Sequence, residues 1–237
     1  MNAQVVTVSH KHPTEPYYRF DVFLASLARF ADTPTVLGMH EPWHGLMTKA
    51  FLYRNWLRAR KNKSDRLILC DAWDIVFALH PHGIGDRCAE RFGKDAVVFN
   101  GEKACWPRAD LSETFPDTGP WRYLNCGFIC GPSDAILTMF ETMDLEAIGV
   151  DRKEGGRMIE PNDQGEFQAL FQKQPVKMVV DGSCHLAQTL SACSLDEFDL
   201  SGQNIVNRVT GTTPGVLHFN GGSKNDIMPV MHKHLNL

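Results

Sequence analysis

Leu67-Ile68-Leu69-Cys70-Asp71-Ala72-Trp73-Asp74 joins an apolar run to two carboxylates, and the interpretation of the whole sequence starts from this stretch. The apolar run indicates a buried strand, so Asp71 and Asp74 lie where that strand leaves the core. Carboxylate oxygens at such an edge suit Mg²⁺ or Mn²⁺, and a divalent ion there can bridge the two phosphates of a nucleotide leaving group. The pattern indicates sugar-nucleotide chemistry. The alternative is that one aspartate caps a turn and the other is only solvated.

Strand and helix patterns alternate on both sides of this stretch. The expected strands are short apolar or β-branched runs, at residues 4–9, 34–37, 67–70, 96–99, 176–180 and 216–219. The expected helices have apolar residues at helical spacing or a Pro-Ser start, over residues 17–31, 46–61, from 132 and around 167–171. The polar segment 149–162 is expected to be a mobile loop near a site. Such alternation predicts an α/β fold with a largely parallel sheet flanked by helices, whose ligands bind beyond the C-terminal ends of the strands.

The composition is that of an ordinary soluble enzyme. The chain has 237 residues, of which 43% are hydrophobic and 22% are charged, and its length fits one α/β domain over residues 1–237. A net charge of -4 gives no overall basic field, so composition does not indicate nucleic-acid binding. A local basic face is still expected from the cations of one segment, which are Arg54, Arg58, Arg60, Lys61 and Lys63.

The cysteines and the N-terminus indicate a compartment. Seven cysteines without paired CxxC spacing are typical of reduced thiols, and Cys70, Cys126 and Cys130 are expected in the core. No segment is long enough to cross a bilayer, and the N-terminus runs into a strand pattern without a signal region. We therefore expect a cytoplasmic protein, in a bacterial cell or the host cell of a virus, with no membrane partner.

Four further segments, all after the Asp71 segment, extend the carboxylate motif into a longer pattern. They are residues 99–107 (FNGEKACWP), 123–131 (YLNCGFICG), 162–164 (NDQ) and 217–224 (LHFNGGSK). Together, and in this order, the five segments resemble the glycosyltransferase domain of the procollagen lysyl hydroxylase/glycosyltransferase family. The likeness runs from the opening strand to Lys224, and five segments in register are far more specific than any one of them.

The resemblance implies a GT-A fold, a UDP-sugar donor and a Mn²⁺ ion, with Mg²⁺ as the alternative, held by Asp71, Asp74 and His218. Two carboxylates and one imidazole leave coordination positions for diphosphate oxygens. The ion would offset the negative charge that grows on UDP as the sugar–phosphate bond breaks. Trp73 stands where the family has an aromatic residue that stacks on the uracil.

Other residues are expected around the nucleotide. Lys49 matches a family lysine that approaches it, and Lys224 would add a second cation to the diphosphate, although surface lysines are often only solvated. Asn220 would hydrogen-bond phosphate or sugar, and Gly221 would let the backbone approach closely.

The resemblance places Trp106, Asn125, Asp163 and Gln164 around the donor sugar and the acceptor. An aromatic face can pack on a hexose, while amides and carboxylates distinguish its hydroxyl groups. Trp106 alone would more often be a core residue, and Asp163 could simply complement a helix dipole. In an inverting transfer Asp163 is the candidate general base, whereas a retaining route may use the leaving phosphate.

Two departures from the family pattern concern acceptor recognition. The family's longer run of aspartates is reduced here to Asn162-Asp163, and the glycine that usually follows the metal histidine is Phe219. The hydroxylase portions of the large family members are absent from the sequence, so no iron or 2-oxoglutarate chemistry is expected.

We therefore expect a hexosyltransferase that moves glucose or galactose from UDP to a hydroxyl acceptor. The acceptor is either hydroxylysine of a collagen-like peptide, as the resemblance implies, or a hydroxymethylated pyrimidine in phage DNA, which suits a cytoplasmic enzyme. The alternatives are a non-catalytic sugar-nucleotide or glycan-binding protein and a metal-dependent phosphodiesterase. A zinc hydrolase would need the histidine pairs 10/12, 80/82 and 232/234, and none of these lies in a convincing strand pattern.

Overall fold

The computed structural model describes residues 3–10, 20–39, 41–60, 66–149, 152–154, 157–159 and 161–237. Nine of the described strands form one sheet, with the order β2-β1-β3-β6-β5-β10-β13-β4 and with β9 also paired to β5. These strands are β1 (Ala3–Val8), β2 (Thr35–Leu37), β3 (Arg66–Cys70), β4 (Ile75–Phe77), β5 (Val97–Glu102), β6 (Tyr123–Pro132), β9 (Met178–Asp181), β10 (Ala187–Thr189) and β13 (Val216–His218).

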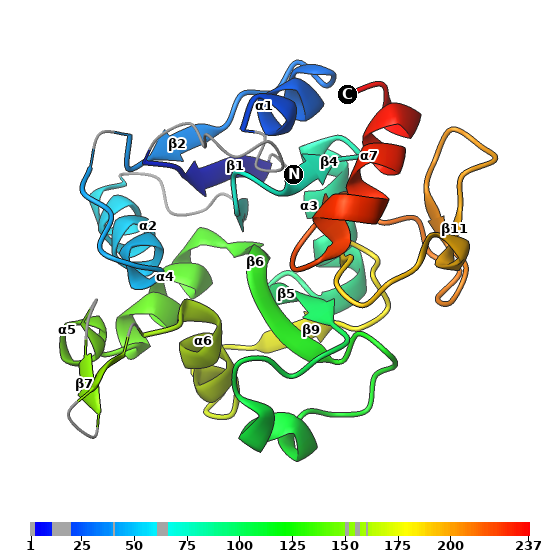
Figure 1. Cartoon of the computed structure of the whole chain (residues 1–237). Coiled ribbons are helices and arrows are strands. Elements are labelled where there is room, and N and C mark those ends of the chain that lie inside the picture. Colours follow the sequence, from blue (N-terminus) through cyan, green and yellow to red (C-terminus); the bar gives the residue numbers. More distant parts are fainter. Residues whose placement is uncertain are drawn as a thin grey trace.

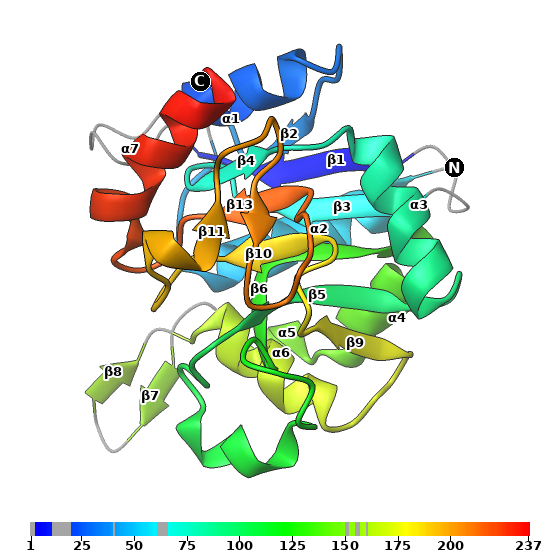
Figure 2. The ribbon, with the colours of Figure 1, turned by 90° about the vertical axis from the view of Figure 1, so that its right-hand side faces the viewer.

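The sheet is mixed but mostly parallel, which confirms the predicted fold class. Strand β1 is parallel to β2 and β3, β5 is parallel to β9 and β10, and β10 is parallel to β13. Strand β6 is antiparallel to both β3 and β5, and β4 is antiparallel to β13 (Figure 2). The long central strand β6 therefore begins at the edge where its neighbours β3 and β5 end.

Helices cover both faces of this sheet. They are α1 (Phe20–Ala28), α2 (Met47–Ala59), α3 (Pro81–Phe92), α4 (Ser133–Thr142), α5 (Leu145–Ile148), α6 (Asp163–Phe171) and α7 (Ser223–Leu235). Two 3₁₀ turns, η1 (Ala109–Thr114) and η2 (Leu195–Glu197), and two small hairpins, β7 (Arg152–Glu154) with β8 (Arg157–Ile159) and β11 (Phe198–Asp199) with β12 (Val206–Asn207), complete the described elements.

The apolar run of β3 shows why the strand pattern is continuous rather than alternating. Successive side chains point to opposite faces, so Leu67 and Leu69 enter one core cluster while Ile68 and Cys70 enter another. The first cluster lies under α2, α4 and α6, and the second lies under α1 and α3 (Figure 1). A strand that is covered on both faces is apolar along most of its length, and all five residues of β3 are buried, including Arg66 at its start.

Several elements differ from the sequence-based expectations. The first helix is described from Phe20 and the second ends at Ala59, close to the predicted bounds. Strand β4 and helices α3 and α7 were not predicted. The predicted loop over 149–162 contains β7 and β8, and its predicted mobility stays untested. None of the helices in the described part of the chain is long and apolar enough to cross a membrane.

Two of the histidine pairs lie in or beside helices, and His12 of the third pair lies outside the described residues. His80 caps α3 by accepting a hydrogen bond from the backbone N–H of His82, and residues 232 and 234 lie in helix α7.

Arg54 is buried and forms an ion pair with Glu146, so the predicted open basic face is wrong for this residue. Lys61 and Lys63 lie outside the described residues.

Candidate active site

A cavity of about 1020 Å³ opens at the edge where the parallel strands end. Strands β1, β5 and β13 contribute their last residues to its wall, and the residues that follow β3 form its floor. The cavity brings together every site residue predicted from the sequence, namely Lys49, Asp71, Trp73, Asp74, Trp106, Asn125, Asp163, Gln164, His218, Asn220, Gly221 and Lys224. A cavity of this size accommodates a ligand as large as a sugar nucleotide.

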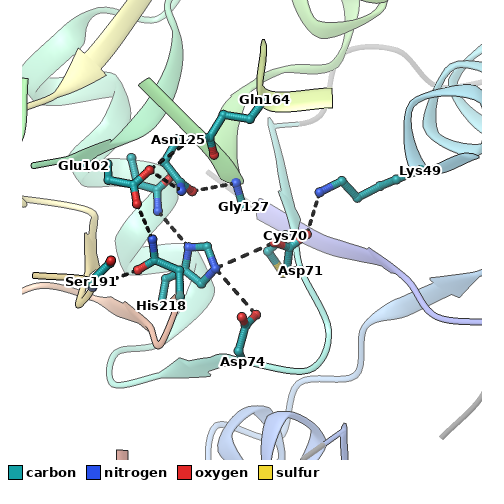
Figure 3. A network of polar contacts seen from close by, with 12 residues as sticks. Lys49, Cys70, Asp71, Asp74, Glu102, Asn125, Gly127, Gln164, Ser191 and His218 are labelled. Atoms are coloured by element: carbon teal, nitrogen blue, oxygen red, sulfur yellow. Dashed lines mark hydrogen bonds and ion pairs between the residues drawn. The ribbon is translucent and has the colours of Figure 1, made fainter. Parts of the chain in front are cut away.

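Asp71, Asp74 and His218 all line this cavity, and their side chains point toward one another (Figure 3). The Nε2 atom of His218 lies 3.5 Å from Oδ1 of Asp74 and 3.7 Å from Oδ2 of Asp71. Each residue offers one ligand atom within 4.8 Å of the others, and no other such group of His, Cys, Asp or Glu occurs among the described residues. Two carboxylate oxygens and one imidazole nitrogen on one side of an open cavity fit a divalent cation with free coordination positions.

Gly127 of strand β6 makes this convergence possible. A Cβ atom at this position would lie 2.2 Å from Cε1 of His218 and 2.8 Å from Oδ2 of Asp71. The backbone oxygen of Gly127 also accepts a hydrogen bond of 3.0 Å from the N–H of Asp71, which fixes the turn after β3. Gly127 lies in one of the five segments of the resemblance, but nothing in the sequence marked it as a residue that touches the metal ligands.

Neighbouring charges shift the pKa values of both Asp74 and His218. Burial alone would raise the pKa of Asp74, but His218 and Lys224 outweigh burial and hold the pKa well below its ordinary value. Burial alone would lower the pKa of His218, yet Asp74 and Asp71 raise it above 6.5. Without a bound cation, these carboxylates therefore favour a proton on His218.

Two lysines flank the carboxylates. The amino group of Lys49 lies 2.6 Å from Asp71 and 2.8 Å from Asp163, and that of Lys224 lies 3.2 Å from Asp74. Although burial opposes it, the pKa of Lys49 is raised well above 10.5 because Asp163 and Asp71 stabilise the charged form. The cavity floor thus carries fixed positive charges beside the candidate metal ligands, an arrangement suited to a diphosphate.

Glu102, which sequence reasoning missed, is the centre of a hydrogen-bond network at the cavity wall (Figure 3). Its carboxylate accepts hydrogen bonds from the side-chain amides of Asn125, Gln164 and Asn220. The oxygen of Asn220 in turn accepts from the backbone N–H groups of residues 190 and 191. The network fixes three predicted sugar-contacting amides in one place, although Asn220 already uses its oxygen within the protein.

Trp106 lies at the cavity mouth, where 58% of its surface is exposed. The alternative that it is a core residue is therefore wrong. Its backbone oxygen accepts hydrogen bonds from the side chains of Gln164 and Gln168, so the loop that holds Trp106 is tied to helix α6. An exposed, anchored indole at a cavity mouth is typical of a surface that binds sugar or peptide.

A second aromatic group lies just after the ends of strands β1 and β3. The Nε1 atom of Trp73 donates to the hydroxyl of Ser9, and the ring of His10 lies 5.5 Å from that of Trp73. His10 also stacks on Trp43, with ring centroids 5.1 Å apart. Trp43 and His10 were not predicted as site residues because they come from irregular segments without periodicity. The group offers aromatic surface for a nucleobase.

Asp163 and Gly221 complete the predicted set. Asn162 caps helix α6, and Asp163 is its first residue, so Asp163 lies where a carboxylate complements the helix dipole and also lines the cavity. Gly221 has a φ of 59° and lies against the side chain of Ser191, where a Cβ would be 2.7 Å from the hydroxyl. A residue with a side chain would be strained at this point of the cavity wall.

Solved structures of other proteins share this fold. The chain is similar to the galactosyltransferase LgtC in complex with donor and acceptor sugar analogues, with a TM-score of 0.57 and 13% identity over 98% of this chain and 94% of that one. It is also similar to the apo form of mouse xyloside xylosyltransferase 1, with a TM-score of 0.56 and 14% identity over 93% and 98% of the two chains. These likenesses show that the chain has a fold of the GT-A type.

The sequence identifies the family within this class. A sequence model of the PLOD GT domain matches residues 1–231, and the chain belongs to this family. It is 27% identical to procollagen-lysine,2-oxoglutarate 5-dioxygenase of Drosophila melanogaster over 94% of this chain, and 26% identical to the human multifunctional procollagen lysine hydroxylase and glycosyltransferase LH3 over 93%. The chain spans only 31% and 30% of the lengths of these two relatives.

Proposed function

We propose that this glycosyltransferase is a metal-dependent hexosyltransferase that uses a UDP-sugar donor. The observation that carries the proposal is the convergence of Asp71, Asp74 and His218 between Lys49 and Lys224 on the floor of one cavity. If these charged residues only formed ion pairs with one another, their carboxylates would not need to face an open cavity.

The residues present fit Mn²⁺, with Mg²⁺ as the alternative, because an imidazole among oxygen ligands suits a transition metal better than magnesium. When bound, the cation supplies charge stabilisation to the UDP leaving group. The chain's own part is to orient the diphosphate: Lys49 and Lys224 provide cations on either side of the carboxylates, and Trp73 provides a surface for the uracil ring.

Glucose or galactose is the proposed sugar. The amides held by Glu102 would face the hydroxyl groups of a hexose, and Trp106 at the mouth would provide an aromatic face for its apolar side. In an inverting transfer, Asp163 would accept the proton of the acceptor hydroxyl. In a retaining transfer, Asp163 would not act as a base. Held in place by its ion pair with Lys49, it would only orient the acceptor.

Hydroxylysine of a collagen-like peptide is the first proposed acceptor, because relatives are named for procollagen lysine. The second is a hydroxymethylated pyrimidine in phage DNA. This second acceptor has weaker support in the structure, since Arg54 is buried and Arg58 is paired with Glu141, which leaves fewer cations for a phosphate backbone. The cytoplasmic location remains a proposal that accords with seven free cysteines.

A donor panel tests the function. UDP-, GDP- and ADP-sugars are incubated with Mn²⁺ and with each acceptor, and products are read by mass spectrometry. The expected result is transfer or slow hydrolysis of UDP-glucose or UDP-galactose, lost with EDTA and in Asp74→Ala but kept in the exposed control Asp95→Ala. Binding of UDP without any product would favour the non-catalytic alternative, and cleavage of phosphate esters without sugar transfer would favour the phosphodiesterase.

A further inference from the structure

Asn100 of strand β5 lies against the side of His218 that faces away from the carboxylates. Its Nδ2 atom is 3.3 Å from Nδ1 of His218, and both side chains are buried. The other ring nitrogen of His218, Nε2, faces Asp74 and Asp71. The ring is therefore held between one amide and two carboxylates, and Asn100 is its described hydrogen-bond partner at Nδ1.

The position of Asn100 is itself a local irregularity of the sheet. Strands β5 and β6 pair with a register shift between Phe99 and Asn100, so that Asn100 lies opposite Asn125. Bulges of this kind redirect a side chain, and they are frequent next to active sites. Here the Asn100 amide lies at the Nδ1 atom of the imidazole, while Gly127 leaves room for the ring on the other strand.

The two ring nitrogens of a neutral histidine cannot both be donors. An amide N–H that donates to Nδ1 suits a ring proton on Nε2, and Nε2 then has no lone pair for a cation. For Nε2 to bind a cation, the ring proton must be on Nδ1, and this N–H needs an acceptor. The Oδ1 atom of Asn100 is buried and has no hydrogen-bond partner among the described residues, and half a turn of the amide exchanges it with Nδ2.

We propose that Asn100 is a positioning residue that selects the metal-binding tautomer of His218. Its Oδ1 accepts the hydrogen bond from Nδ1–H, which directs the Nε2 lone pair between Asp71 and Asp74. The amide serves because it offers an acceptor without adding a third negative charge to the site. This inference rests on the metal-dependent function proposed above.

Direct binding of the metal alone tests the inference without any activity measurement. Free Mn²⁺ is measured by electron paramagnetic resonance in titrations of the wild type, Asn100→Ala, Asn100→Asp and the control Asn207→Ala. Asn207 is equally buried and donates to Gln188. We expect Asn100→Ala to weaken Mn²⁺ binding by about 10- to 100-fold, which is the usual effect of losing such a partner. Asn100→Asp restores binding because a carboxylate accepts from Nδ1–H, and Asn207→Ala binds as the wild type does.

A spectroscopic readout separates positioning from a general loss of structure. In the Mg²⁺-loaded wild type, ¹⁵N-labelled histidine should show the proton of His218 on Nδ1, and Asn100→Ala should lose this single tautomer. Wild-type affinity in Asn100→Ala would overturn the inference and leave the proposed function intact. A proton on Nε2 in the loaded wild type would overturn the inference and would also remove His218 from the proposed metal ligands. A wild type that binds neither Mn²⁺ nor Mg²⁺ would overturn both.

Discussion

The amino group of Lys49 lies 2.6 Å from the carboxylate of Asp71, although the two residues come from a helix and from the end of a strand. A cation bound to Asp71 competes with this ion pair. Lys49 would then be released towards the diphosphate, where its charge remains compensated by Asp163 on its other side. The same lysine is thus expected to oppose metal binding in the absence of nucleotide and to favour nucleotide binding once the metal is present.

Lys49→Met should therefore change two affinities in opposite directions. We expect tighter binding of Mn²⁺ alone and weaker binding of UDP in the presence of Mn²⁺, by about tenfold for each 1.4 kcal/mol of lost interaction. Electron paramagnetic resonance and calorimetry measure the two affinities. The variant should also lose about 3–5 kcal/mol of stability, because Asp163 is left buried without its partner. Lys49→Met combined with Asp163→Asn should recover part of this loss, and a single variant that weakens both affinities equally would contradict the competition.

Glu102→Gln tests the network at the cavity wall. The wild-type carboxylate accepts three amide hydrogen bonds, whereas a glutamine side chain has one oxygen and would turn an N–H group towards another donor. We expect kcat/KM to fall by about 100-fold, equivalent to about 2.7 kcal/mol, with the larger part in kcat if the network contacts the sugar in the transition state. Steady-state kinetics check this, and the exposed Glu141→Gln is the matched control. An unchanged kcat/KM would mean that the network only supports the fold.

The architecture could be predicted from the sequence where the local hydrophobic pattern agrees with the tertiary packing. The run at 67–70 is continuous because helices cover both faces of the sheet, and the helix at 46–61 has a clear apolar stripe. Helix α7 was missed because Pro229 interrupts its pattern, although Ile227, Met231 and Leu235 do recur at helical spacing. Strand β4 has only three residues and follows Asp74 directly, so no periodicity could reveal it.

Residues of the candidate site could be predicted where the residue type itself indicates the chemistry. Carboxylates at a strand end and the segment around His218 could be recognised from chemistry and resemblance together. Glu102 and Gly127 could not, because their roles depend on residues far away in the sequence: Glu102 accepts from Asn220, and Gly127 makes room for His218. Such roles arise only when the sheet brings β5, β6 and β13 to one edge.

Gly127→Ala should abolish cation binding through a steric effect alone. The added methyl group would lie 2.2 Å from His218, and because both strands are buried neither side can retreat easily. We expect Mn²⁺ affinity to fall by at least about 100-fold, together with a stability loss of about 1–3 kcal/mol typical of overpacking. Mn²⁺ titration and thermal unfolding measure both. Gly202→Ala, where an added methyl group meets nothing within 4 Å, is the control. Normal Mn²⁺ binding by Gly127→Ala would show that the three ligand residues do not act as one site.

The contacts of His218 with the carboxylates predict that the stability of the metal-free protein falls with rising pH while the affinity for Mn²⁺ increases. In the metal-free protein the pKa of His218 is raised above 6.5, with Asp74 and Asp71 as the stabilising partners, so the protonated ring stabilises the fold. This stabilisation is fully present below about pH 6.5, the unfolded value, and is lost as the pH rises through the folded pKa. Mn²⁺ competes with the same proton, so its affinity should rise over the pH range in which metal-free stability falls. Thermal unfolding and Mn²⁺ titration between pH 6 and 9 measure the two curves. In Asp74→Asn the stability change should move towards pH 6.5, because the nearest carboxylate is gone; an unshifted curve would mean that another group is responsible.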